Sequence, residues 1–193
     1  MFDFQKKCME YAKEQGFQAV EIYGEQSTSL SLKVFQGEVD AYETSDEGGV
    51  KLRIIENGQA GEAYTEKLDA SSFSFLVESA KNNAAILSGD TALLPFEGSE
   101  SYHSGSYFEP TLENIKPAVL TDILLKLERA ILQIDDRVTK VTHCGASLSK
   151  VERILMNSSG LEQREQKNGL VIYAGALAEQ GEEKKSGFVT RII

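Results

Sequence analysis

One layout occurs twice in this sequence: an amphipathic helix followed by strands that are joined through tight glycine turns. The first copy runs from about residue 4 to residue 64, and the second from about residue 120 to residue 191. Gly37 aligns with Gly160, 123 residues later, and Gly49 aligns with Gly169, 120 residues later. A near-constant offset of this kind indicates a duplicated structural unit. We therefore expect an α+β fold of two helix-plus-antiparallel-sheet units, with the helices packed on one sheet face.

Two short turns fix the expected strand pairing in the first copy. Gln36-Gly37 and Asn57-Gly58 each have the composition of a two-residue hairpin turn. The first turn places Leu32 and Val34 on one sheet face and Lys33 on the other, because side chains alternate along a strand. The second turn predicts three cross-strand pairs: Leu52 with Ala63, Lys51 with Tyr64, and Arg53 with Glu62.

The chain divides into three parts on the same reasoning. Residues 1–87 form the first unit, residues 88–116 a Gly/Ser/Pro-rich connection, and residues 117–193 the second unit, all of which could still belong to one compact domain. Asp69 can cap a helix over about residues 70–87, and Pro117 suits the first turn of another helix. The apolar stripe predicted for that later helix is Leu120, Ile123, Leu124, Leu127, Ala130, Ile131 and Ile134.

The strands of the second unit are less clearly marked. Residues 160–167 are polar on both faces, which predicts either an edge strand or a mobile hairpin. Asn168-Gly169 has the composition of a turn that leads into the next strand. Lys184 and Lys185 beside two glutamates indicate an exposed hairpin. The strand-like end, residues 188–193, predicts either a docked C-terminal strand or a chain that continues.

Charge and hydropathy exclude several functions. The chain has 193 residues and a net charge of −10, and nucleic-acid binding normally needs a basic face. The N-terminus lacks the pattern of a signal peptide, and no apolar run reaches the length of a membrane span. We expect a cytoplasmic protein with no direct nucleic-acid or membrane partner.

Few residues could support catalysis. Cys8 and Cys144 are most simply read as buried, reduced thiols. His143 adjoins Cys144, but neighbouring side chains on a strand point to opposite faces, so these two should not form a nucleophile–base pair. A pair of Cys144 with His103 is left open. The residues 46–49 read as a carboxylate-rich turn, either a solvated turn or a weak cation site. We assign no catalytic, cofactor-binding or metal-binding residue.

Three aromatic side chains stand out in the polar connection. Tyr102, Tyr107 and Phe108 could form a docking surface, or they could pack back onto their own domain. The sequence leaves both readings open.

Several segments together resemble the N-terminal region of the TldD/PmbA (TldE) family. In the first copy these are residues 21–23, 37–40, 49–53, 61–65 and 68–69, which match the family's early strand, its two hairpins and its helix start. In the second copy they are Asp136-Arg137-Val138 and the run 154–160, ILMNSSG. The order and spacing of these segments carry the resemblance, which covers nearly the whole chain.

The resemblance implies a zinc metallopeptidase system that acts on peptides, whose members were historically called modulators of DNA gyrase. The family's metal motif, His-Glu-x-x-x-His, belongs to a C-terminal half that this sequence lacks, so zinc is expected only in the C-terminal half of a TldD-type subunit. The sequence is then either a fragment or a divergent short member.

The resemblance gives the chain an expected role in assembly and substrate enclosure, without catalytic residues of its own. Expected partners are a second copy of the chain or a TldD-type subunit, and a peptide as the substrate of the complete assembly. The alternative is a non-enzymatic protein–protein interaction module, a scaffold like the gyrase modulators.

Overall fold

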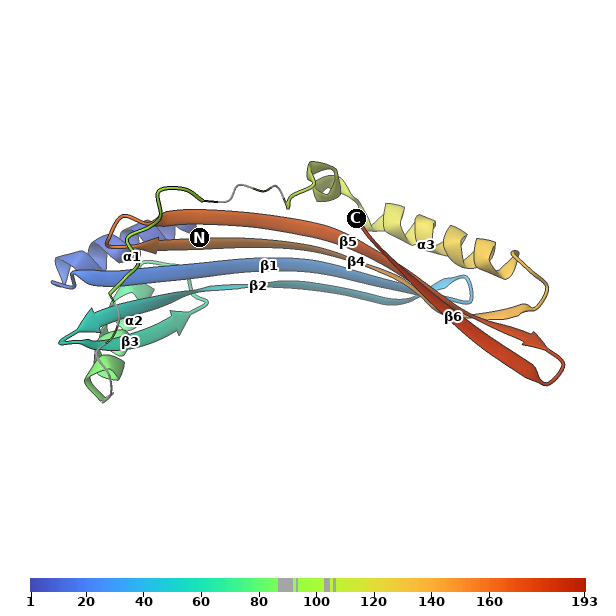
Figure 1. Cartoon of the computed structure of the whole chain (residues 1–193), viewed down its shortest axis with the longest axis horizontal. Coiled ribbons are helices and arrows are strands. Elements are labelled where there is room, and N and C mark those ends of the chain that lie inside the picture. The colour runs from blue at the N-terminus through green and yellow to red at the C-terminus, as the bar shows by residue number, and fades with distance from the viewer. Residues whose placement is uncertain (87–91, 93, 103–104, 106) are drawn as a thin grey trace. The chain divides into compact units, whose positions relative to one another are not determined.

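The structure, a computed structural model, describes residues 1–86, 92, 94–102, 105 and 107–193. The elements in chain order are α1 (Phe2–Glu14), β1 (Ala19–Phe35), β2 (Glu38–Glu56), β3 (Gln59–Thr65), α2 (Ser72–Ile86), the 3-10 helix η1 (Pro110–Asn114), α3 (Pro117–Leu132), β4 (Val138–Asn157), β5 (Glu162–Gln180) and β6 (Glu183–Ile192). Figure 1 shows these elements along the chain.

The predicted duplication is present in the fold. A helix precedes three consecutive strands in both copies, α1 before β1–β3 and α3 before β4–β6. The six strands form one antiparallel sheet in the order β3-β2-β1-β4-β5-β6, so the first strand of each copy lies at the centre. Gly37 and Gly160 both follow the first strand of their copy and both have positive φ. The α+β prediction is therefore confirmed.

Both predicted hairpin turns are confirmed. Gln36 and Gly37 have φ of 54° and 79°, and Asn57 and Gly58 have φ of 51° and 77°. Positive φ at both central residues is the mark of a type I′ turn, whose twist matches that of the strands it joins. The β2–β3 register is the predicted one: Leu52 pairs with Ala63, Lys51 with Tyr64, and Arg53 with Glu62. Leu32 and Val34 are buried while Lys33 is exposed, also as predicted.

Contacts divide the chain into two compact units, each drawn from several segments. Unit 1 comprises residues 1–26, 47–105 and 151–166, and unit 2 comprises residues 27–46, 106–150 and 167–193. The core of unit 1 joins α1 and α2 to the sheet through the buried residues Phe4, Cys8, Met9, Ala12, Phe17, Val20, Ile22, Val50, Leu52, Ile54, Leu76, Val77, Ala80, Ile154 and Met156.

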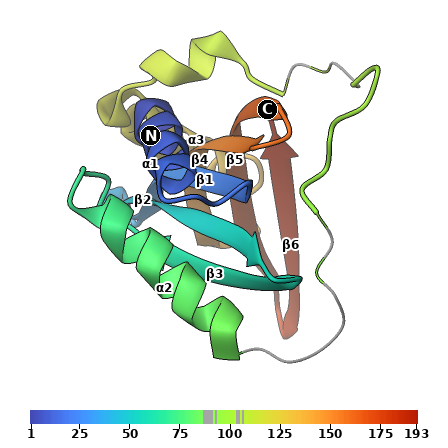
Figure 2. The same ribbon diagram turned by 90° about the vertical axis from the view of Figure 1, so that its left-hand side faces the viewer.

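In unit 1 the edge strand β3 is covered by α2 (Figure 2). The side-chain amide of Asn83 on α2 donates a 2.7 Å hydrogen bond to the carbonyl oxygen of Glu62 on β3. A Cβ atom at Gly61 would lie 1.9 Å from the carbonyl oxygen of Ala80, so glycine is what lets the helix approach the strand this closely. This edge of the sheet is therefore protected from further pairing.

The core of unit 2 packs α3 and η1 against the sheet. Its buried residues are Leu32, Val34, Leu112, Leu120, Leu124, Val141, Cys144, Ala146 and Leu170. The predicted stripe on α3 is partly wrong, because Ile123 and Ala130 are exposed and Ile134 lies beyond the helix end. A charged residue takes a buried place instead: Glu128 is only 3% exposed.

The strands are longer than the sequence indicated, which corrects two expectations. Residues 46–49 lie within β2 and do not form a turn. Asn168 and Gly169 lie within β5, so the predicted turn there is wrong. The polar segment 162–167 is the start of the same strand, where Arg164 pairs with Glu152 and Arg153 pairs with Glu165 across to β4. The exposed hairpin at Lys184 and Lys185 is confirmed, since β5 and β6 join at residues 181–182. None of the helices in the described residues is long and apolar enough to cross a membrane.

Candidate functional site

The two thiols are unsuited to nucleophilic catalysis. Cys8 is fully buried in unit 1, and burial raises the pKa of its thiol to about 12. Cys144 is 2% exposed, and burial, with the nearby negative charge of Glu128, raises its pKa to about 11. A nucleophilic cysteine needs the thiolate at neutral pH, which requires the opposite shift.

Cys144 takes part in a packing contact between β4 and α3. Its Sγ donates a hydrogen bond to the carbonyl oxygen of Leu124 on α3, at 3.5 Å. His143 is exposed, with its ring near Phe188, so the two neighbours point to opposite faces as predicted. His103 lies outside the described residues. The described thiols and imidazole therefore do not form a catalytic pair.

Metal ligation would require several His, Cys, Asp or Glu side chains close together. No group of three His, Cys, Asp or Glu side chains that could hold an ion occurs in the part of the chain that the structure describes. A catalytic zinc site typically uses three protein ligands. The described residues therefore offer no such ligand set, and the resemblance places the zinc in a C-terminal half that lies outside this sequence.

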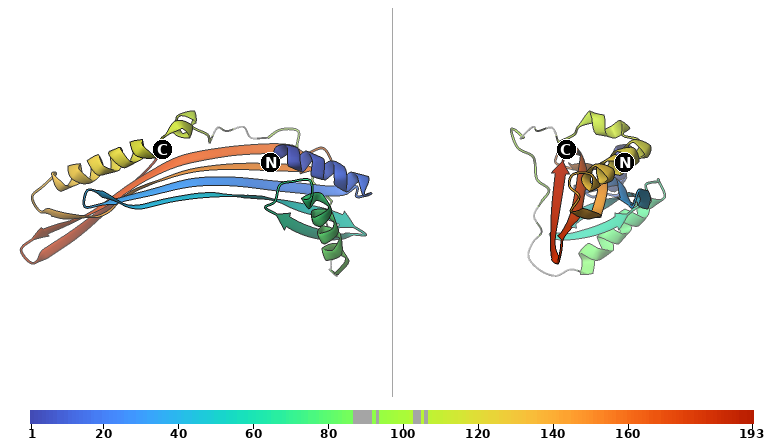
Figure 3. Two further views of the ribbon diagram at one scale, coloured as in Figure 1. Left: turned by 180° about the vertical axis from the view of Figure 1, so that it is seen from behind. Right: turned by 90° about the vertical axis from the view of Figure 1, so that its right-hand side faces the viewer.

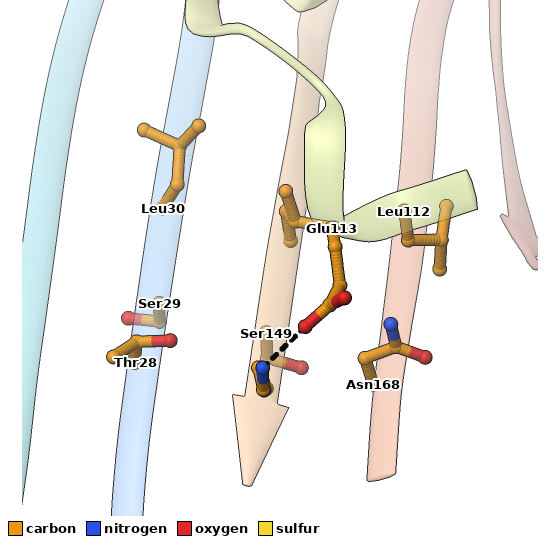
Figure 4. A pocket seen from close by; sticks show the side chains of 9 residues that line it. Thr28, Ser29, Leu30, Leu112, Glu113, Ser149 and Asn168 are labelled. Atoms are coloured by element: carbon orange, nitrogen blue, oxygen red, sulfur yellow. Dashed lines mark hydrogen bonds and ion pairs between the residues drawn. The ribbon is translucent and has the colours of Figure 1, made fainter. Parts of the chain in front are cut away.

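A largely apolar pocket of about 250 Å³ lies in unit 2 between η1 and the strands β1, β4 and β5 (Figure 4). Its lining includes the apolar side chains of Leu30, Leu112 and Leu148, together with Thr28 and Asn168. At its side, Lys150 Nζ donates to Glu113 Oε1 of η1 at 2.5 Å. This ion pair neutralises both charges, so the pocket offers hydrogen-bonding groups but neither a free base nor a nucleophile.

Asn168, which lines this pocket, also holds the backbone of Glu109. Its Oδ1 accepts a 2.7 Å hydrogen bond from the backbone N–H of Glu109, and its Nδ2 donates a 2.9 Å bond to the carbonyl oxygen of the same residue. Tyr107 forms a parallel bridge with Lys167 directly beside it. These contacts bind the end of the connection to the edge of β5.

Two of the three connection aromatics pack against their own unit. Lys167 Nζ lies 5.2 Å from the ring centroid of Tyr107, and Lys150 Nζ lies 5.3 Å from that of Phe108. Cation–π contacts of this kind hold the rings on the sheet. For Phe108, which is half-buried, the structure therefore favours packing, whereas Tyr107 is 57% exposed and keeps both readings open. Tyr102, in unit 1, accepts a hydrogen bond from the backbone N–H of Ser99.

The most exposed element of the sheet is β6. It is the last strand in the sheet order (Figure 3). Every one of its residues is exposed. Phe188, Val189, Ile192 and Ile193 at its end have exposed fractions of 65%, 65%, 74% and 59%. This edge has no covering helix among the described residues, in contrast to β3.

The β5–β6 register shows which backbone groups of β6 point outward. Leu170 and Ile193 exchange two backbone hydrogen bonds, of 3.1 and 2.9 Å. In an antiparallel pair such mutual bonds recur at every second residue, so the odd-numbered residues of β6 bond to β5. The even-numbered residues then direct their N–H and C=O groups away from the sheet: Lys184, Ser186, Phe188, Thr190 and Ile192.

An aromatic cluster supports this strand from the neighbouring strands. The ring of Phe188 stacks on Tyr173 of β5 at a centroid distance of 6.1 Å, and meets the edge of His143 of β4 at 6.2 Å. Tyr173 lies over Gly145, where a Cβ atom would be only 2.4 Å from the tyrosine hydroxyl. The sheet therefore presents a fixed apolar surface next to an open row of backbone groups. Sequence reasoning found the edge but not the cluster, because its members come from three strands.

Comparison with known families accounts for both halves of the chain. The family model for the PmbA/TldA metallopeptidase domain 1 matches residues 20–84, and the model for the PmbA/TldA metallopeptidase central domain matches residues 110–191. The chain belongs to the PmbA/TldD family. The predicted resemblance is thereby confirmed, on two consecutive family domains in the expected order.

Three solved structures share the PmbA/TldD fold of this chain. A candidate modulator of a DNA gyrase from Thermotoga maritima superposes with a TM-score of 0.86 at 22% identity, covering 100% of this chain and 43% of that one. TldE from Thermococcus kodakarensis gives 0.81 at 19% identity, with 97% and 43% covered. A candidate DNA gyrase modulator from Bacteroides thetaiotaomicron gives 0.76 at 19% identity, with 98% and 44% covered.

These likenesses establish the fold alone, because all three identities are low. The chain spans less than half the length of each of these structures. No curated protein matches the chain.

Proposed function

We propose that this chain is the N-terminal assembly and substrate-enclosing region of a PmbA/TldD-type zinc metallopeptidase system that acts on peptides, and that it carries no catalytic residues itself. The observation that supports this most directly is the open edge of β6, with outward backbone groups and four exposed apolar side chains. Family membership supplies the context of a peptidase system.

An open strand edge is suited to assembly because it binds through the main chain. An added strand satisfies outward N–H and C=O groups whatever its side chains are, and the pattern of side chains beside the edge then selects the partner. On the other side of the sheet α2 covers β3, whereas β6 has no covering helix among the described residues.

The described residues provide a sheet surface and hydrogen-bonding groups that could enclose a peptide, and they lack an activated nucleophile. Both thiols are buried with raised pKa values, and the charged side chains of the pocket beside η1, Glu113 and Lys150, are paired with each other. In this proposal the zinc and its ligands come from the C-terminal half of a TldD-type subunit. The sheet of this chain encloses the peptide that the other subunit cleaves.

The proposal is tested by producing the chain together with a TldD-type subunit from the same source. We expect the two to co-purify, and we expect peptide cleavage by the pair to exceed cleavage by the TldD-type subunit alone. The matched control is the chain with Gly187→Ala, which adds a methyl group where no atom lies within 4 Å and should co-purify as the unaltered chain does. Failure to bind the TldD-type subunit would contradict the proposal. Binding with no change in peptide cleavage would instead support the interaction-module alternative.

A further inference from the structure

The end of β6 has a sequence pattern that is complementary to itself. Phe188 and Ile192 lie on the same face of the strand, since both are even-numbered, and Thr190 lies midway between them. When two copies of this strand run antiparallel about Thr190, Phe188 of each copy lies opposite Ile192 of the other. Cross-strand apolar pairs are the main side-chain source of stability between paired strands.

Other symmetric registers are less favourable because of charge. Centring the pair on Phe188 places Lys185 opposite Arg191, and centring it on Arg191 places two arginines opposite each other. Like charges directly opposite destabilise a strand pair. Centring on Val189 avoids repulsion but places Phe188 opposite Thr190, so it forms no Phe–Ile pair.

One competing register gains an ion pair. Centring on Gly187 places Glu183 opposite Arg191, but it leaves Phe188 opposite Ser186 and Ile192 near the charged hairpin. An exposed ion pair contributes only about 0–1 kcal/mol, and salt weakens it further. The two symmetry-related Phe188–Ile192 pairs of the Thr190 register remove four apolar side chains from water, which favours that register.

We propose that β6 binds β6 of a second copy of this chain, antiparallel and centred on Thr190. The inference rests on the proposed function, since it assigns the open edge of that assembly to a second copy of this chain and leaves the rest of the surface to the TldD-type subunit. The outward N–H and C=O groups of Phe188, Thr190 and Ile192 pair with the same groups of the other copy. The Tyr173 and His143 rings that pack on Phe188 hold it in place for this contact.

Disulfide trapping tests the register. In the proposed pair the two Thr190 residues face each other as a hydrogen-bonded pair, with Cα atoms about 5.5 Å apart. That distance lies within the range of a disulfide, about 4.4–6.8 Å. We expect Thr190→Cys to form a covalent dimer under mild oxidation. The native Cys8 and Cys144 are 0% and 2% exposed and should not contribute.

Gly187→Cys is the matched control. A side chain at this position has no atom within 4 Å, so the substitution should leave the strand intact. In the proposed register the two positions 187 are far apart and should not cross-link. Equal or faster cross-linking of Gly187→Cys than of Thr190→Cys would overturn the register, and absence of cross-linking in both would overturn the pairing.

Sedimentation of the uncross-linked chain gives an independent measurement. We expect a dimer, and we expect Thr190→Lys to raise its dissociation constant at least tenfold, because two ammonium groups would then face each other. Ser186→Lys, on the same face but four residues from the centre of the pair, should change it less than about threefold. A chain that is monomeric at all concentrations overturns the inference, as does one whose β6 amides are protected only by an added extended peptide. A monomer that still binds the TldD-type subunit would leave the proposed function standing.

Discussion

The carboxylate of Glu128, on α3, accepts a 2.8 Å hydrogen bond from the backbone N–H of Gly37, 91 residues earlier in the chain. Its second oxygen accepts a 2.8 Å bond from the N–H of Gln36. One buried side chain thus holds both central residues of the β1–β2 turn. Backbone N–H groups of a turn are partial positive charges, and bonds from them to an ionised acceptor are stronger than neutral ones.

Removal of this carboxylate should destabilise unit 2. We expect Glu128→Ala to lower the free energy of unfolding by about 1.5–3 kcal/mol, the usual contribution of hydrogen bonds to a charged group. Glu128→Gln should cost less, because one oxygen can still accept. Urea denaturation measures both. Arg129→Ala, an exposed neighbour on the same helix, is the control and should change stability by less than about 0.5 kcal/mol.

The inward face of α3 is defined by Leu124, which is 0% exposed. We expect Leu124→Ala to lower the free energy of unfolding by about 2–5 kcal/mol, since it leaves a cavity in the core of unit 2. The adjacent Ile123 is 42% exposed, so Ile123→Ala should cost less than about 1 kcal/mol. Equal denaturation midpoints for the two variants would show that the helix face is assigned wrongly.

Close contact between α2 and β3 depends on Gly61. We expect Gly61→Ala to destabilise the chain by about 1–3 kcal/mol or more, because the new methyl group would overlap the Ala80 carbonyl oxygen and the helix must shift. Gly187→Ala, on the open strand, adds the same methyl group where no atom lies within 4 Å. Thermal unfolding of the two variants side by side makes the comparison. A Gly61→Ala protein as stable as Gly187→Ala would contradict the packing.

Both cysteines should resist alkylation in the folded protein. The pKa of Cys8 is raised to about 12 and that of Cys144 to about 11, so at pH 7.5 the neutral thiol dominates at each site. The iodoacetamide rate should rise only as pH approaches these values, and both residues should react quickly in denaturant. Mass spectrometry of the labelled peptides measures this. Selective modification of native Cys144 at neutral pH would revive a thiol-enzyme reading.

The sequence determined the local turns, because their chemistry is local. A type I′ turn needs positive φ at both positions, and Asn57-Gly58 supplies residues that tolerate it with no help from elsewhere. Polar–apolar alternation on both sides then fixed the register of β2 and β3. The family resemblance was equally accessible, since it rests on the order of such segments.

The same composition predicts a turn at Asn168-Gly169, and there the prediction is wrong. Asn168 does not turn the chain there, because its side chain bonds the backbone of Glu109, 59 residues away, while Leu170 beside it is buried. The turn preference of Asn-Gly contributes less to stability than the continuous backbone hydrogen bonds of the strand and the burial of Leu170. A contact so distant in sequence leaves no periodic signal.

Glu128 most clearly separates what the local sequence predicts from what the tertiary structure decides. Read alone, the sequence of α3 places a glutamate on the solvent side, because burial of an unpaired carboxylate is costly. The tertiary structure reverses this by bringing the two N–H groups of a turn to that spot. What the sequence determined by itself was therefore the helices, the first hairpins and the family, all of which follow from residues near one another in the chain. Only the tertiary structure decided which polar groups are buried, that β3 is closed by α2, and that β6 is left open, because each depends on groups brought together from distant segments.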